Sequence, residues 1–221
     1  FIKKKMKLLT IIDYGSGNIK SVYNAFNLIS KKKFKVIISS KKADLKNSSH
    51  LVLPGVGSFE SCINGLRNSN LVDTILKKVE IEKKPFLGIC VGMQMLASKG
   101  FENGEFLGLN WIEGDVKKIE KINQNLKIPH MGWNNLQIKK ENYFIKKLKK
   151  KINTPEISAY FVHSYNFHTK NSDDKIMSTS YGQEITAMVS KNNVIGVQFH
   201  PEKSHKFGIK FLETFIENEE F

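Results

Sequence analysis

The chain has 221 residues, enough for one sizeable domain with a buried core. Hydrophobic residues make up 40% and charged residues 25%, and no apolar run reaches the roughly 18 residues of a membrane span. The formal net charge of +14 permits an anion-binding surface, but Arg67 is the only arginine. Because proteins that read bases or phosphates usually use the guanidinium fork, we expect solvated lysines and no nucleic-acid or membrane partner.

The chain begins without a methionine, so we interpret residues 1–5 as a cloning remnant or an N-terminal extension and expect one domain over residues 6–221. The basic start is not expected to be a signal peptide, because the apolar stretch behind it contains Asp13. Two cysteines, Cys62 and Cys90, provide no disulfide framework. This favours a reducing, cytoplasmic location.

The N-terminal half alternates short apolar runs with helical patterns. Strands are predicted at 8–12, 34–38, 50–53 and 85–89, and helices at 19–29, 59–79 and 92–98. Such alternation predicts a single α/β domain with a mainly parallel central sheet and helices on both faces.

Shorter strands with polar turns follow Gly100. They are predicted at 114–119, 158–162, 176–179, 186–190 and 194–199, before a closing helix at 206–216. The lysine-rich segment 139–151 contains Tyr143, Phe144 and Leu148, which can fix a short helix to the core. We find no linker or internal repeat, and therefore expect one domain.

The segment Gly-Ile-Cys-Val-Gly-Met-Gln at 88–94 places Cys90 between a buried strand and a helix. It is the cysteine counterpart of the Gly-x-Ser-x-Gly nucleophile elbow, a cramped turn in which the flanking glycines prevent collisions. The helix N-terminus behind such a turn favours a thiolate over a thiol. Cys90 is therefore a candidate nucleophile; the alternative is a structural cysteine buried beside turn glycines.

A cysteine nucleophile needs a base, and the segment Gln-Phe-His-Pro-Glu at 198–202 offers one. If this segment approaches Cys90, His200 can take the thiol proton and Glu202 can orient the imidazole. An isolated His-Pro-Glu is more often an ordinary loop, so the triad depends on the geometry of the fold.

Together, segments 88–94 and 198–202 resemble the class I (triad) glutamine amidotransferases, over essentially residues 8–216. Segments 13–18, 54–59, 129–134 and 160–165 are similar to the glutaminase subunits of imidazole glycerol phosphate synthase. The resemblance implies a cofactor-free hydrolysis of L-glutamine to L-glutamate and ammonia by Cys90, His200 and Glu202. It also implies a cyclase partner of (βα)8-barrel type that uses the ammonia in histidine biosynthesis.

The resemblance assigns further roles residue by residue. The oxyanion-binding donors would lie at Val91 and in the turn formed by Gly55, Val56 and Gly57, a peptide thought to flip in this family. The family's glutamine-binding positions match Gln94, Tyr160, His163, Ser164 and Tyr165.

Three residues match the family's interface with its synthase: Asn18, Trp133 and Lys203. Their alternatives are a helix cap, a core aromatic and a surface charge, respectively. The remaining histidines lack metal-ligand spacing, so we expect no metal. Cys62 is expected to be inert packing.

Rival functions remain open from the residues alone. A paralogous amidotransferase can share these motifs while supplying ammonia to a different synthase, such as one that amidates a surface sugar. A lysine-rich binding module without catalysis and a cysteine peptidase built on the same elbow are the other two. The match to the glutamine-binding positions argues against the peptidase.

Overall fold

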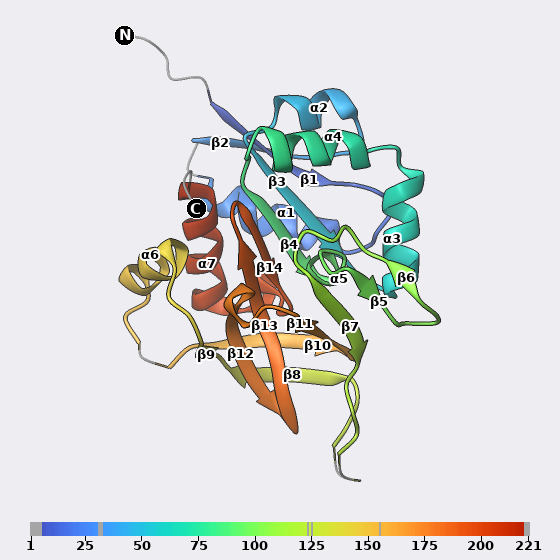
Figure 1. The fold of residues 1–221 in the computed structure, drawn as a ribbon. Coiled ribbons are helices and arrows are strands. Elements are labelled where there is room, and N and C mark those ends of the chain that lie inside the picture. Colours follow the sequence, from blue (N-terminus) through green and yellow to red (C-terminus); the bar gives the residue numbers. More distant parts are fainter. Residues whose placement is uncertain (1–5, 31–32, 123, 125, 155, 219–221) are drawn as a thin grey trace.

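The computed structural model describes residues 6–30, 33–122, 124, 126–154 and 156–218 (Figure 1). Its strands are β1 Lys7–Ile12, β2 Phe34–Ser39, β3 His50–Gly55, β4 Phe86–Cys90, β5 Lys99–Gly100, β6 Phe106–Leu107, β7 Gly114–Lys118, β8 His130–Asn135, β9 Gln137–Ile138, β10 Ser158–His163, β11 Tyr165–Thr169, β12 Lys175–Tyr181, β13 Gln183–Lys191 and β14 Val194–Val197. The α-helices are α1 Ile19–Ile29, α2 Lys42–Asn47, α3 Phe59–Asn68, α4 Val72–Leu76, α5 Val91–Gln94, α6 Tyr143–Lys151 and α7 His205–Glu217.

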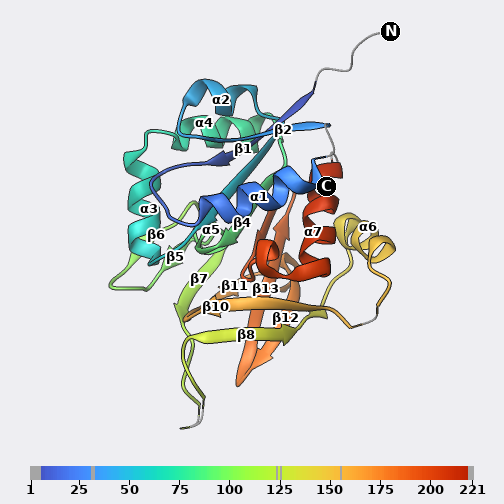
Figure 2. The same ribbon diagram turned by 180° about the vertical axis from the view of Figure 1, so that it is seen from behind.

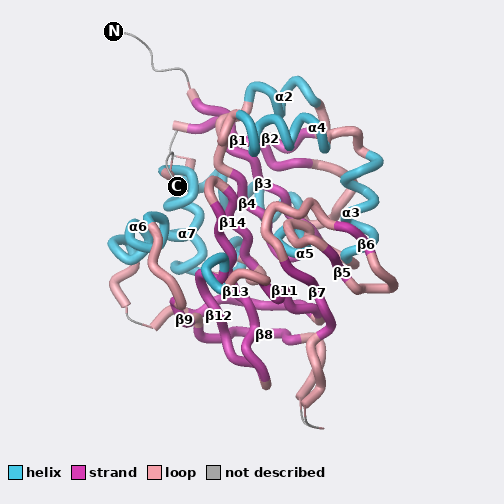
Figure 3. Tube along the Cα trace, in the orientation of Figure 1, coloured by secondary structure: helices cyan, strands magenta, loops and turns pink. Residues whose placement is uncertain are grey.

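An eight-stranded sheet runs through the molecule in the order β2-β1-β3-β4-β14-β13-β12-β9. The strands from β2 to β14 pair in parallel, and those from β14 to β9 pair antiparallel. Two smaller sheets, β10-β8 and β11-β7-β5-β6, lie against its lower half, as Figure 3 shows. The expected mainly parallel sheet is therefore confirmed, with an antiparallel extension.

Helices cover both faces of this sheet. Helices α3 and α4 lie toward the viewer in Figure 1, whereas α1 and α7, which contact each other, lie toward the viewer in Figure 2. Phe26 of α1 meets Phe215 of α7 edge to face, with 6.2 Å between ring centroids. Both side chains are fully buried, and burying one phenylalanine contributes about 1.5–3 kcal/mol. These contacts hold α1 and α7 together on one face of the sheet. The sheet in turn supports the loops at its C-terminal edge.

The predicted helix at 59–79 is wrong as a single element. Helix α3 ends at Asn68, and α4 begins at Val72 before a π-helical turn at Lys77–Ile81. Between them Asn70 adopts a left-handed φ of 58°. The Ser69 hydroxyl donates to the Leu66 carbonyl and accepts from the Leu71 N–H, a local pattern that competes with helix continuation.

The helix predicted at 92–98 is also shorter than expected, because α5 ends at Gln94. The backbone carbonyls of Leu96 and Ala97 accept from residues 110–112 instead of continuing the helix. The short helix predicted in the lysine-rich segment is present as α6, with Phe144 and Leu148 buried but Tyr143 exposed. Within the described ranges, no helix is long and apolar enough to cross a membrane.

Candidate active site

Cys90 stands at the junction of β4 and α5, at the C-terminal edge of the parallel strands. Its backbone has φ 55° and ψ −115°, a conformation that L-residues rarely adopt. A Cβ on Gly92 would lie 1.9 Å from the Leu53 carbonyl oxygen, and one on Gly88 would lie 2.5 Å from the Gly92 carbonyl oxygen. The flanking glycines are therefore sterically required, and the predicted elbow is present.

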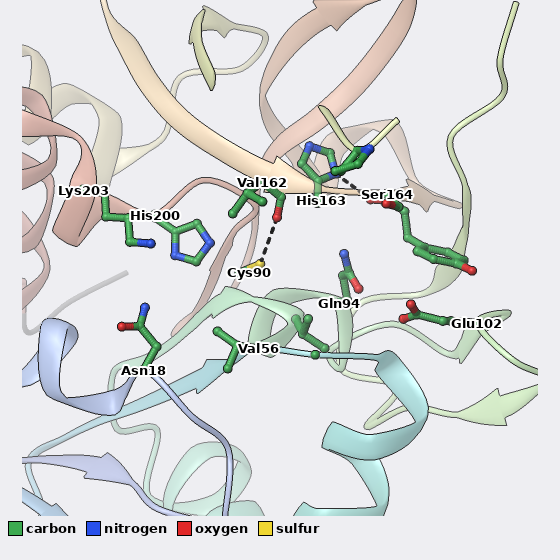
Figure 4. A pocket seen from close by; sticks show the side chains of 14 residues that line it. Asn18, Val56, Cys90, Gln94, Glu102, Val162, His163, Ser164, His200 and Lys203 are labelled. Atoms are coloured by element: carbon green, nitrogen blue, oxygen red, sulfur yellow. Dashed lines mark hydrogen bonds between the residues drawn. The ribbon is translucent and has the colours of Figure 1, made fainter. Parts of the chain in front are cut away.

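The cysteine opens into a cavity of about 480 Å³ (Figure 4). It is lined by Asn18, Val56, Gly57, Cys90, Val91, Gln94, Glu102, Pro129, Val162, His163, Ser164, Tyr165, His200 and Lys203. Figure 4 shows Asn18, His200 and Lys203 at one end and Glu102 at the other, with Cys90 and Gln94 between them. Loops separated widely in the sequence thus converge on the elbow.

His200 and Glu202 meet beside the cysteine. The Nδ1 of His200 lies 2.8 Å from the Oε1 of Glu202, and the two side chains are 3% and 1% exposed. The His200 backbone N–H donates to the Tyr160 carbonyl, and its carbonyl accepts from the Ser204 hydroxyl. The first bond holds the backbone of His200 against β10, and the second ties it to Ser204.

The charge state of His200 follows from its neighbours. Burial alone lowers the pKa of His200, but the adjacent Cys90 sulfur and the Glu202 carboxylate outweigh it and raise that pKa to about 10. The Nε2 of His200 has no hydrogen-bond partner among the described residues. The ring therefore carries a proton at neutral pH, and Nε2, the nitrogen not paired with Glu202, is the one turned to the Cys90 sulfur and the substrate.

The predicted oxyanion turn lies next to Cys90. In this conformation it does not offer the Val56 N–H to the cavity as a hydrogen-bond donor. Val56, Gly57 and Val91 line the cavity, whereas Gly55 lies behind them, paired with Cys90 across the strands. The Val56 N–H donates to the Ser16 hydroxyl at 3.0 Å. That N–H is therefore committed outside the cavity in this conformation.

The expected substrate-binding residues divide into two groups. Gln94, Ser164 and Tyr165 line the cavity, and so does His163. Tyr160 lies outside the cavity lining, and its ring faces Trp133 and the ammonium of Lys203. Phe161 is buried, as expected for a core residue.

His163 belongs to a buried polar chain. Its Nδ1 lies 2.8 Å from the Tyr165 carbonyl oxygen, so Nδ1 carries the proton and Nε2 is an acceptor. The Nδ1 of His130 lies 3.0 Å from that Nε2 and must donate to it. Burial lowers the pKa of His163 to about 3 and that of His130 to about 4. Both imidazoles are therefore neutral, and their chain fixes the loop that carries Ser164 and Tyr165.

Glu102 is a cavity residue that the sequence did not single out. Its carboxylate accepts the Phe59 N–H at 2.6 Å, and burial raises the pKa of this carboxyl above its ordinary value. The residue lies in a polar loop after α5, where no sequence pattern distinguishes a functional acidic residue from an ordinary surface one. Only the approach of this loop to α3 reveals it.

Two of the three residues expected at a partner interface lie at one end of the cavity. Asn18 and Lys203 line it. Trp133 is 47% exposed, which rules out the core alternative, and its ring stacks on His205 with centroids 4.6 Å apart. Asn18 precedes α1 but makes no capping bond; its Oδ1 accepts from the Ser21 hydroxyl instead.

The two remaining expectations concern metals and the second thiol. Across the described residues, no group of three or more His, Cys, Asp or Glu side chains is placed to hold a metal ion. Cys62 is buried, donates to the Val56 carbonyl, and has a pKa raised by that burial. It therefore packs beneath the oxyanion turn and does not open into the cavity.

Comparison with known proteins defines the class. Residues 10–218 match the glutamine amidotransferase class-I family. The structure superposes on that of PurLQS from Thermotoga maritima with a TM-score of 0.69 at 18% identity, covering 96% of this chain and 98% of that one, which supports the fold. The chain therefore belongs to the class-I glutamine amidotransferases.

Its similarity to one group of these enzymes is closer. It is 44% identical over 209 residues to the imidazole glycerol phosphate synthase subunit HisH of Pelagibacter ubique, covering 94% of this chain and 98% of the relative. The HisH subunit of Bradyrhizobium diazoefficiens is 42% identical over 212 residues, with 94% and 97% covered. The resemblance drawn from the sequence motifs is thus confirmed across the chain.

Proposed function

We propose that this chain is the glutaminase subunit of an imidazole glycerol phosphate synthase. It hydrolyses L-glutamine to L-glutamate and ammonia and hands the ammonia to a cyclase subunit. The observation that carries this proposal is the buried His200–Glu202 pair beside Cys90, on a strained elbow that opens into a cavity of ligand size.

The chemistry follows from the charge states. The Cys90 sulfur attacks the side-chain carboxamide carbon of glutamine, and the carbonyl electrons move onto oxygen. The protonated His200 then gives its Nε2 proton to the amine as ammonia leaves, which produces a thioester. Neutral His200 next accepts a proton from water as the water attacks, and the carbon–sulfur bond breaks to release glutamate. Glu202 holds the imidazole in position throughout.

The oxyanion requires donors that the resting geometry does not fully provide. The Val91 N–H at the start of α5 is one donor. The second comes from the Gly55–Gly57 turn after the Val56 N–H leaves the Ser16 hydroxyl. Losing one such donor typically costs about 3 kcal/mol of transition-state stabilisation. The lone subunit is therefore nearly inactive, and a partner that reorients this turn activates it.

Glutamine occupies the part of the cavity between Glu102 and Cys90. The Glu102 carboxylate pairs with the α-ammonium group, and polar groups of Gln94, Ser164 and Tyr165 complete the site. The carboxamide end then reaches Cys90. Complementary charge at a defined distance from the nucleophile favours an amino acid over a neutral amide.

The partner is a cyclase of (βα)8-barrel type that docks over Asn18, Trp133 and Lys203. Two of these residues line the cavity, so a subunit seated there covers the exit used by ammonia. The cyclase combines the ammonia with a phosphorylated carboxamide ribonucleotide (PRFAR). The products are imidazole glycerol phosphate and an aminoimidazole carboxamide ribotide.

The test is glutamate release by the full chain, with and without the purified cyclase and its nucleotide ligand. We expect strong stimulation that is lost in Cys90→Ala. Cys90-dependent activity that ignores this cyclase would assign the chain to a paralogous synthase instead. Absence of glutamate with every partner would overturn the glutaminase assignment.

A further inference from the structure

Gln198 is a buried polar side chain that has no role in the hydrolysis of glutamine by Cys90, His200 and Glu202 as proposed. It follows β14, is fully buried, and its backbone N–H donates to the Ala187 carbonyl. Its side-chain Nε2 lies 3.7 Å from the Sγ of Cys90, and its Oε1 accepts a hydrogen bond from the Nε2 of Gln94 at 2.9 Å. The amide thus bridges the nucleophile and a residue of the cavity wall.

The bond with Gln94 determines which end of the Gln198 amide faces the sulfur. Because Oε1 accepts from Gln94, the NH2 group is turned toward Cys90. The sulfur also lies 4.0 Å from the Val162 carbonyl oxygen. A carbonyl can only accept, so it favours S–H, whereas an amide N–H can only donate, so it favours the anionic sulfur.

We propose that Gln198 is a catalytic residue whose side-chain N–H stabilises the Cys90 thiolate, and that Gln94 is the positioning residue that orients it. The inference rests on the proposed glutaminase function. The donor acts twice in the cycle: on the anionic sulfur before it forms the carbon–sulfur bond, and again when that bond breaks and its electron pair returns to sulfur. The neutral thioester between these steps needs no such donor.

Two substitutions separate this role from packing. Gln198→Leu removes the donor at similar volume, and Gln198→Glu replaces it with an acceptor of the same shape. The readout is alkylation of Cys90 by iodoacetamide in the full chain without glutamine, followed by peptide mass spectrometry so that Cys62 is scored separately. We expect alkylation at pH 7 to slow about tenfold in Gln198→Leu and further in Gln198→Glu, with the alkylation profile moved to higher pH.

A second variant leaves Gln198 in place. A carboxylate in Gln94→Glu can only accept, so it draws the Gln198 NH2 group toward itself and turns Oε1 to the sulfur. Alkylation should fall again, although no group touching the sulfur has been replaced. Gln137→Glu, on the exposed face of β9, is the charge control and should alkylate like the wild type.

Failure of the inference about Gln198 can be distinguished from failure of the proposed glutaminase function. If folded Gln198→Leu and Gln94→Glu both alkylate at the wild-type rate and pH, the inference is wrong even where the wild-type chain releases glutamate with its partner. If Gln198→Leu does not fold, Gln94→Glu decides by the same criterion. A wild-type chain that never releases glutamate overturns the proposed function, while alkylation still reports on the donor. In the cyclase complex, kcat should fall about tenfold in Gln198→Leu with KM for glutamine unchanged.

Discussion

The Val56 N–H donates to the Ser16 hydroxyl at 3.0 Å, although Val56 belongs to the turn expected to bind the oxyanion. Cys62 adds a second bond to the same residue, at the Val56 carbonyl. The turn is therefore anchored from both sides in an orientation that withholds one donor from Cys90.

This anchoring predicts that Ser16→Ala raises the glutaminase activity of the isolated chain. Removing the hydroxyl costs the resting orientation one hydrogen bond, worth about 1 kcal/mol, so basal kcat should rise about fivefold. The stimulation by the cyclase should shrink by the same factor. Ser16→Thr, which retains a hydroxyl, is the control, and unchanged basal activity in Ser16→Ala would refute the anchoring.

Substitution of Glu102 should affect binding more than chemistry. Glu102→Gln retains an acceptor for the Phe59 N–H but removes the charge facing the α-ammonium group. We expect KM for glutamine to rise about tenfold with kcat nearly unchanged, which steady-state assays in the cyclase complex measure directly. Glu105→Gln, an exposed neighbour in the same loop, serves as the matched control. A drop in kcat alone would place Glu102 elsewhere in the mechanism.

We expect Glu202 to affect stability and activity through its contact with His200. The raised pKa of His200 means that its proton contributes stability fully below the ordinary value of 6.5, and that this contribution is lost as the pH rises toward about 10. In Glu202→Gln the imidazolium loses its partner and the folded-state pKa of His200 falls, so the stability lost as the pH rises is smaller and the loss is complete at a lower pH. We also expect kcat to fall about a thousandfold. Urea unfolding between pH 7 and 9 and activity at pH 7 test both parts. A variant with the wild-type pH slope would contradict the pairing.

The neutral pair His130–His163 predicts an acid-sensitive fold. Both pKa values are lowered, so the stabilisation is present above 6.5 and is lost as the pH falls toward about 4 and about 3. Between pH 7 and 5 each imidazole should account for about 2 kcal/mol of lost stability, because only the unfolded chain takes up protons. His130→Gln should therefore show a pH dependence about 2 kcal/mol shallower in urea unfolding. Nitrogen-15 NMR should find both rings protonated at Nδ1, and Nε2–H tautomers would contradict the chain.

Local patterns in the sequence were enough for the elbow and for most of the parallel sheet. Gly88 and Gly92 flank the cysteine because the turn leaves no room for a Cβ at either position. Both glycines lie within two residues of Cys90, so the requirement can be recognised from the local sequence. The break at Asn70 was missed because a left-handed asparagine is only one of several conformations that its neighbours allow.

Features that depend on distant segments were not predictable. The direction of the Val56 N–H is set by Ser16, which lies 40 residues away in the chain. Glu102 enters the cavity through a contact with Phe59, 43 residues earlier. Tyr160 was expected at the substrate, but the strand pairing of β10 with β8 places it opposite Trp133. Such relationships arise from tertiary packing, which no spacing rule encodes.

The central claim is that Cys90 carries a covalent γ-glutamyl group during turnover. The most direct measurement mixes the complex with radiolabelled glutamine, quenches it with acid within the first turnover, and maps the label by peptide mass spectrometry. We expect label on the peptide that contains Cys90, sensitive to hydroxylamine and absent from Cys90→Ala. Turnover of glutamine with no label on Cys90, or with label on Cys62, would contradict it.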